Sequence, residues 1–311
     1  MRFGLTTPVV TLVPRSHAAW EADAGPEELR RIAAAADGLG YDYLSCSEHV
    51  GVPAADAEVR GGRYYEPAAT LGFVAAITQR IRLLTHVVVL PYHHPLAIAK
   101  RYGTLDRLSG GRVILGVGVG SLKPEFALLG IDFDGRGPRY EDALRALRAA
   151  LGQRRPAYRG THYEFSDFVV EPCAVQTRMP IWIGGRSARS LRRALELADG
   201  WDPFGLGHEQ LRNLLERARA WPQWTARREP LEVVLTPERP LPLDDAAQVE
   251  QARAAMAAYA SIGATAMNLR FRHHSLAHYL ELLERFAAEV MPAFASSAGS
   301  SGKAQGITEA R

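Results

Sequence analysis

Three stretches of the chain share one pattern: residues 33–44 (AAAADGLGYDYL), 195–204 (LELADGWDPF) and 259–269 (YASIGATAMNL). Each is a helix-forming run, rich in alanine or leucine, that reaches a glycine and continues into an apolar run. A glycine at the end of a helix can adopt the left-handed conformation that closes the last turn, so the chain can reverse into a buried strand. The repetition of this pattern predicts an α/β protein with a parallel sheet.

Apolar runs in the rest of the chain bring the predicted strands to eight. We expect strands at residues 2–8, 41–49, 80–90, 113–120, 180–183, 200–204, 231–236 and 265–271. Helices are expected at residues 26–39, 67–78, 94–108, 140–151 and 187–197, and near 208–220, 244–260 and 275–290. Eight strands alternating with helices in 311 residues favour a closed (β/α)8 TIM barrel over an open sheet.

The remaining segments suggest one domain with an insertion and a tail. Residues 152–179 contain prolines and an alternating aromatic stretch, which indicates a hairpin or irregular loop inserted before the fifth strand. A glycine-rich loop is expected from the second strand to Tyr65. Residues 1–294 are expected to form the barrel domain, and the small, polar residues 295–311 a disordered tail.

Composition excludes several classes of protein. The net charge of +3 and the scattered arginines argue against nucleic acid as the main partner. Two cysteines, Cys46 and Cys173, cannot form a disulfide framework. No apolar run reaches membrane-spanning length and no signal peptide is evident, so a cytoplasmic protein without a membrane partner is expected.

The loops that follow the strands of such a barrel carry its chemistry. The candidate site residues at the predicted strand ends are Thr6, Thr7, Ser47, Glu48, His49, His86, Gly118, Gly120, Ser121, Gly184, Gly185, Arg186, Pro203, Phe204, Arg270 and Arg272.

Two of these strand ends suggest specific chemistry. His49 can exchange a proton near neutral pH, and the adjacent Glu48 could orient it, although the pair could also be structural. The Gly184-Gly185-Arg186-Ser187 turn opens a helix whose free N–H groups suit a phosphate, or it is simply a tight turn. His86, inside an apolar strand, is either a satisfied core histidine or a residue beside a ligand.

Other sites are less well supported. The glycines at 116, 118 and 120 do not form a dinucleotide fingerprint, but they could let a flat ring approach the backbone. Histidines pair at 93–94 and 273–274, yet the first strand has none and neighbouring histidines point in different directions. We therefore expect no metal site.

A set of ordered motifs resembles the bacterial luciferase-like flavin and deazaflavin oxidoreductase superfamily, and within it the branch that uses coenzyme F420. The motifs are residues 27–49, 64–67 (YYEP), 80–95 (RIRLLTHVVVLPYHHP), 105–120 (LDRLSGGRVILGVGVG), 125–126, 136–144, 171–185 (EPCAVQTRMPIWIGG) and 198–201. They span about the first two-thirds of the chain.

The resemblance implies roles for individual residues. The bond between His86 and Val87 would be a non-prolyl cis peptide behind the cofactor ring, which Val89 and Gly118 would contact. The turn at Gly184, Gly185, Arg186 and Ser187 would hold the cofactor phosphate. Ser121, also assigned to the cofactor site, stands where sugar-phosphate dehydrogenases of the family have a carboxylate, which argues for a reductase.

The sequence therefore predicts a homodimeric, F420-dependent reductase acting on a small organic substrate. His49 would donate the proton and Glu48 would orient it, while Tyr64, Tyr65 and the insertion would line the substrate pocket. The alternatives are an FMN-dependent monooxygenase, a non-enzymatic flavin-binding barrel and, third, a metal hydrolase.

Overall fold

Parallel strands joined by helices close into a barrel in the structure, a computed structural model that describes residues 1–14 and 17–295. The tail predicted at residues 295–311 lies outside the described residues from 296 onward. The barrel strands are β1 (Arg2–Thr6), β3 (Tyr43–Cys46), β5 (Arg82–Thr85) continued by β6 (Val88–Val89), β7 (Val113–Gly118), β10 (Ile181–Gly184), β11 (Gly200–Asp202), β12 (Glu232–Leu235) and β13 (Ala266–Leu269). The pairing of β10 with β7 closes the ring, which confirms the predicted (β/α)8 TIM barrel.

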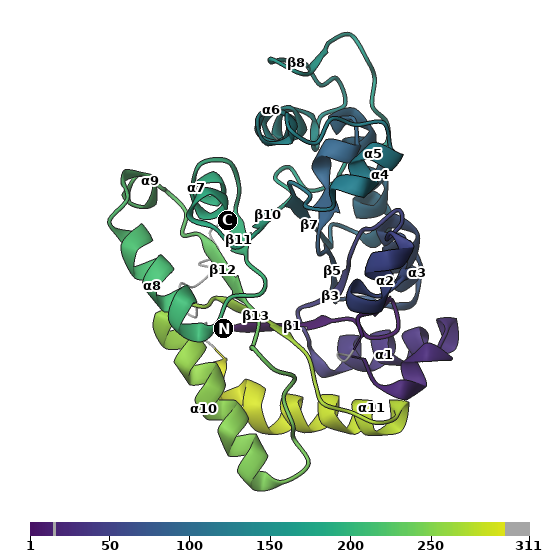
Figure 1. Cartoon of the computed structure of the whole chain (residues 1–311), viewed down its shortest axis with the longest axis vertical. Coiled ribbons are helices and arrows are strands. Elements are labelled where there is room, and N and C mark those ends of the chain that lie inside the picture. The colour runs from purple at the N-terminus through teal and green to yellow at the C-terminus, as the bar shows by residue number, and fades with distance from the viewer. Residues whose placement is uncertain (15–16, 296–311) are drawn as a thin grey trace, which may run out of the picture.

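Helices form the outer layer around these strands (Figure 1). The main helices are α1 (Pro26–Leu39), α3 (Pro67–Ile77), α4 (Pro95–Ser109), α6 (Arg136–Ala150), α7 (Ala188–Leu197), α8 (His208–Arg219), α10 (Ala246–Ile262) and α11 (Leu276–Arg285). Shorter turns of helix are η1 (Ala19–Ala22), η2 (Leu90–Tyr92), α9 (Pro222–Thr225), η3 (Phe286–Val290) and η4 (Met291–Phe294). Within the described residues, no helix is long and apolar enough to cross a membrane.

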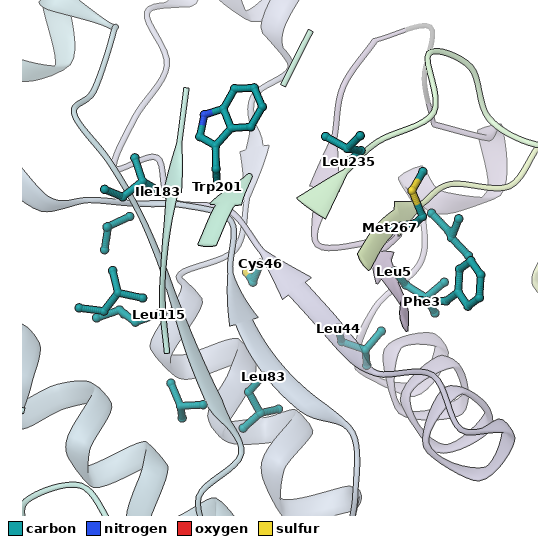
Figure 2. Packing of buried hydrophobic residues seen from close by; sticks show 14 of the residues in the cluster. Phe3, Leu5, Leu44, Cys46, Leu83, Leu115, Ile183, Trp201, Leu235 and Met267 are labelled. Carbon is teal, nitrogen blue, oxygen red and sulfur yellow. The ribbon is translucent and has the colours of Figure 1, made fainter. Parts of the chain in front are cut away.

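The apolar core has two parts, because successive side chains of a strand point to opposite faces. The larger part packs strands against helices, and Figure 2 shows Leu44, Leu83 and Leu115 projecting from neighbouring strands within it. The smaller part fills the barrel interior with Tyr43, Leu84, Ile114, Trp182, Val234 and Ala266. This inner layer seals the barrel, so a ligand has to bind at its end rather than pass through it.

Glycines end helices as predicted in two of the three defining stretches. Gly40 after α1 and Gly263 after α10 have φ of 83° and 109°. In the third stretch the helix α7 ends at Leu197, and Gly200 is instead the first residue of β11. A Cβ atom at position 200 would lie 2.4 Å from Trp182 Cδ1, so this glycine makes room for the tryptophan of the inner layer.

Three regions differ from the expected elements. The predicted strand at 80–90 is interrupted, because the peptide bond between His86 and Val87 is cis and separates β5 from β6. The predicted loop up to Tyr65 contains the helix α2 (Ala54–Arg60) and the strand β4 (Arg63–Tyr64), which pairs antiparallel with β2 (Thr11–Leu12). A further helix, α5 (Lys123–Leu128), follows β7.

The insertion at residues 152–179 contains a small hairpin. Its strands are β8 (Tyr158–Arg159) and β9 (Glu164–Phe165). The hairpin is anchored on α6, where Asp142 accepts hydrogen bonds from the Tyr158 hydroxyl at 2.6 Å and from the backbone N–H groups of His162 and Tyr163. This arrangement agrees with the hairpin that the sequence allows for.

Candidate active site

His49 lies just beyond the carboxyl end of β3, and its partner is a carboxylate from a different part of the chain. Its Nδ1 atom is 2.9 Å from Oε2 of Glu125, a residue of α5. The carboxylate is an acceptor, so Nδ1 carries the hydrogen in this pair and Nε2 is left to exchange a proton. The imidazole is 20% exposed and Glu125 is fully buried.

Four hydrogen bonds fix Glu125 in place. The Tyr92 hydroxyl donates to Oε2 at 2.9 Å, and the backbone N–H groups of Val50 and Gly51 donate to Oε1 at 2.6 and 3.3 Å, in addition to the bond from His49. Burial alone would raise the pKa of Glu125, but the hydrogen bonds from His49, Tyr92 and Val50 outweigh it and lower the pKa. A carboxylate held in its charged form can both orient the imidazole and balance a positive charge on it.

The expected pairing of Glu48 with His49 is wrong. Glu48 Oε1 lies 2.8 Å from His93 Nε2, and its Oε2 accepts a hydrogen bond from the N–H of Val89 at 2.7 Å. Adjacent residues of an extended chain point in opposite directions, so Glu48 turns to the β6 side while His49 turns to α5. Glu48 thereby ties the end of β3 to β6.

Glu125 lies in one of the family motifs, but the sequence does not identify it as a site residue. Ser121 stands where sugar-phosphate dehydrogenases of the family have a carboxylate, but α5 brings the carboxylate of Glu125 to His49 a few residues later. The available signal was Pro124 followed by Glu125, since a proline and an acidic residue are typical of the first turn of a helix. Ser121 itself is exposed at the end of the loop before α5.

Of the two predicted pocket tyrosines, the structure brings one to His49. The rings of Tyr64 and His49 meet edge to face with their centroids 4.5 Å apart, and the Tyr64 hydroxyl donates to the carbonyl of Arg60. Tyr65 packs partly buried against the core, and its carbonyl accepts a bond from the thiol of the buried Cys46 at 3.5 Å. Tyr64 is therefore the better placed of the two to contact a substrate next to His49.

Val87 packs against two of the predicted cofactor-binding glycines. A Cβ atom at position 118 would lie 2.6 Å from Val87 Cγ2, and one at position 184 would lie 3.0 Å from Val87 Cγ1. Gly118 and Gly184 therefore make room for the Val87 side chain, which spans β7 and β10. The cis peptide that the resemblance implies is present at this point, and the Ser47 hydroxyl donates to the His86 carbonyl at 2.7 Å.

The side chain of His86 points to a buried acid at the end of β11. Its Nε2 lies 3.2 Å from Oδ2 of Asp202, and Asn268 Nδ2 donates to the other oxygen at 2.8 Å. Burial would lower the pKa of His86, but the charge of Asp202 and a hydrogen bond to it outweigh this and raise the pKa. The pairing with Asp202 agrees with the first of the two interpretations, a core histidine with a satisfied side chain, and makes His86 part of a polar group in the barrel.

The turn after β10 combines a glycine of positive φ, a serine cap and an arginine. Gly185 has a φ of 115°, and Ser187 caps α7 by accepting a hydrogen bond from the N–H of Ser190 at 3.2 Å. The guanidinium of Arg186 is exposed and lies 5.8 Å from the ring centroid of Phe204. The backbone and the cation of this turn suit a phosphate, and phosphate binding at this turn stays a prediction.

Residues 1–14 and 17–295 bring no three His, Cys, Asp or Glu side chains together in a way that could hold a metal ion. The polar groups described at this end of the barrel are the His49–Glu125 and His93–Glu48 pairs, the group around His86 and the turn at Gly185.

Solved structures of other enzymes share this fold over nearly its whole length. The monooxygenase RslO1 from Streptomyces bottropensis matches with a TM-score of 0.76 at 21% identity, over 95% of this chain and 100% of that chain. The coenzyme F420-dependent tetrahydromethanopterin reductase from Methanopyrus kandleri matches with a TM-score of 0.70 at 16% identity, over 94% and 99%. The oxygenating constituent of 3,6-diketocamphane monooxygenase from Pseudomonas putida, in complex with FMN, matches with a TM-score of 0.70 at 15% identity, over 94% and 98%.

At these identities the similarity to the solved structures shows the fold alone, so the family has to be assigned from the sequence. The profile of the luciferase-like monooxygenase family matches residues 1–307, so the chain belongs to this family of oxidoreductases.

Proposed function

We propose that the chain is a coenzyme F420-dependent reductase in which His49 donates a proton to a small organic substrate. The observation that carries the proposal is the imidazole of His49, held through Nδ1 by the buried Glu125 at 2.9 Å, at the carboxyl end of a barrel strand. A histidine fixed in this way has one free nitrogen with which to transfer a proton.

The residues present fit a deazaflavin. Val87, packed on Gly118 and Gly184, offers an apolar surface for a ring, and the turn from Gly185 to Ser187 would hold a phosphate. The bound cofactor would supply the hydride, and the barrel would orient it. His49 would add the proton from its Nε2, Tyr64 would bound the substrate beside it, and Glu125 would keep the ring of His49 in place.

FMN is the alternative cofactor, and two comparisons support it. RslO1 is described as a monooxygenase, and the diketocamphane enzyme was solved with FMN bound. With FMN and oxygen the same residues would serve a monooxygenase, with His49 again positioned to exchange a proton.

Titration of the purified apoprotein with F420 and, separately, with FMN tests the proposal, with ligand fluorescence as the measure. We expect F420 to bind at least tenfold more tightly than FMN. A preference for FMN would favour the monooxygenase, and oxygen uptake with reduced FMN would then identify it. If neither binds, the proposal fails and a non-enzymatic barrel becomes the better description.

Replacing His49 tests its role directly. We expect His49→Ala to lower kcat about 100-fold or more, because general acid catalysis contributes factors of this order. The dissociation constant for F420 should change less than threefold. His274→Ala, at an exposed histidine outside the insertion, is the control. If turnover of His49→Ala equals that of wild type, His49 is not the proton donor.

A further inference from the structure

Above the apolar layer that fills the barrel, the strands carry a polar layer. Side chains two positions further along a strand return to the same face. The inward-facing Leu84 and Ala266 are therefore followed by His86 and Asn268. Gly200, which faces Trp182 of the inner layer, is followed by Asp202, and Arg270 comes two residues after Asn268. This end of the barrel is the one that carries His49.

Several buried atoms of this layer have no hydrogen-bond partner among the described residues. They are Asp202 Oδ2, Asn268 Oδ1 and Arg270 Nε. Asp202 Oδ2 is compensated by its ion pair with His86 at 3.2 Å. The amide oxygen of Asn268 and the Nε of the Arg270 guanidinium are therefore the two atoms left without a partner. Buried polar groups without partners are uncommon in native proteins, and each calls for an explanation such as a bound group.

Arg270 has few contacts for a partly buried arginine. Arg148 and Arg193 form ion pairs with Asp199 and Glu141. The guanidinium of Arg270 forms no ion pair within the described residues, and its one hydrogen bond runs from Nη2 to the carbonyl of Pro237, at 3.4 Å. Arg112 and Arg227 also form no ion pair among the described residues, but each donates several hydrogen bonds to carbonyl oxygens. Burial lowers the pKa of Arg270, and no acidic group offsets this.

We propose that Arg270 binds a carboxylate of the substrate at this end of the barrel. A guanidinium can hold a carboxylate through two parallel N–H donors, and the single charges match. The inference rests on the proposed function, which places the substrate beside His49, and it adds the chemical class of that substrate.

The cofactor phosphate is a less suitable partner for Arg270. The turn that would hold the phosphate follows β10, whereas Arg270 follows β13, and β11 and β12 lie between these strands in the sheet. A phosphate dianion would also leave one charge uncompensated at a single guanidinium. Recognition of a singly charged acid is the simpler match.

Calorimetric titration with benzoate and with benzamide tests the proposal on the apoprotein and on protein saturated with the cofactor. We expect benzoate to bind wild-type protein and benzamide to bind at least tenfold more weakly, because only benzoate carries the charge. Arg270→Gln should weaken benzoate binding about tenfold or more, and Arg270→Lys, which keeps the charge, should weaken it less. Arg239→Gln is the matched control, because Arg239 is exposed and lies in the loop after β12.

Three outcomes would overturn the proposal: equal binding of benzoate and benzamide, benzoate binding that Arg270→Gln leaves unchanged, and F420 or FMN binding that Arg270→Gln weakens tenfold. The last outcome would assign Arg270 to the cofactor. Benzoate is titrated without turnover, so its binding is measured independently of the reaction. If the chain binds neither cofactor, but benzoate binds wild type and not Arg270→Gln, the proposed function is contradicted and the anion site is still supported. Circular dichroism and the Tm of each variant exclude misfolding, with Arg270→Lys as the second variant.

Discussion

At the scale of single residues, the packing of Val87 against Gly118 and Gly184 shapes the surface at the end of the barrel. The Val87 side chain occupies the space that a methyl group at position 118 would need. The same contact holds β6 against β7, where Val88 and Val89 pair with Val117 and Gly118. A change at position 118 should therefore affect both stability and the proposed cofactor surface.

We expect Gly118→Ala to destabilise the protein by about 1–3 kcal/mol through overpacking. Val87→Ala removes the Cγ2 atom at 2.6 Å and leaves Cβ at 3.7 Å, an ordinary contact distance. The double variant should therefore be more stable than the sum of the two single changes implies. Urea unfolding of all four proteins measures this coupling. Gly62→Ala, where a Cβ atom would meet nothing within 4 Å, is the control, and strict additivity would contradict the expected clash.

The site also shows which residues a sequence can reveal. His49 could be predicted because a histidine at a strand end stands out from the apolar run before it. Its partner could not, because Glu48 is adjacent in sequence but points the other way, while Glu125 is 76 positions away. Which of two carboxylates meets the imidazole depends on the path of the chain after β7, and periodicity does not determine that path.

At the scale of elements, most helices and strands follow from periodicity and caps. The predicted helix at 26–39 coincides with α1, which has Pro26 at its start and Gly40 after its end. The predicted strands are longer than the observed ones, because apolar sequence continues past the last paired residue of each strand. The short elements α2, α5 and β4 were missed, since two to seven residues carry too little pattern to distinguish them from a loop.

The helix α5 deserves a test because it supplies Glu125. Phe126 on this helix is fully buried, and its ring meets those of Tyr92 and Phe133 at centroid distances of 4.7 and 5.2 Å. We expect Phe126→Ala to cost about 3–5 kcal/mol of stability. It should also lower kcat, because the helix that holds Glu125 against His49 loses its anchor.

Chemical denaturation and steady-state kinetics would measure these two effects. Leu128→Ala, an exposed position of the same helix, is the control and should change neither quantity appreciably. Wild-type kcat in a folded Phe126→Ala protein would show that α5 does not need this anchor to position Glu125.

At the scale of the whole molecule, buried and partly buried carboxylates join elements around the barrel. Asp199, between α7 and β11, forms ion pairs with Arg148 and Arg178 and accepts the N–H of Ile181 at 2.8 Å. Burial would raise the pKa of Asp199, but Arg148, the Ile181 N–H and Arg178 outweigh it and lower the pKa. Hydrogen bonds likewise outweigh burial and lower the pKa values of Asp37 and Asp142.

A carboxylate with a lowered pKa in the folded state adds stability above the pKa of the unfolded chain, and that stability is lost as the pH falls through the folded value. We expect the unfolding free energy to decline below about pH 4, near the ordinary Asp pKa. Asp199→Asn should cost about 3 kcal/mol at pH 7, and the loss should shrink as the pH falls. Denaturation between pH 2.5 and 7 would measure it, with the exposed Asp134→Asn as control. A pH-independent difference would argue against the charge as the cause.

The burial of Cys46 has a practical consequence for labelling. Burial raises the pKa of the Cys46 thiol to about 12, whereas Cys173, on the insertion, is partly exposed. Because thiol reagents react with the thiolate, maleimides at neutral pH should modify Cys173 and leave Cys46 untouched. The unaltered chain therefore offers one attachment point for a fluorophore, on the segment expected to lie over the substrate. A dye there could report ligand binding without any engineered cysteine.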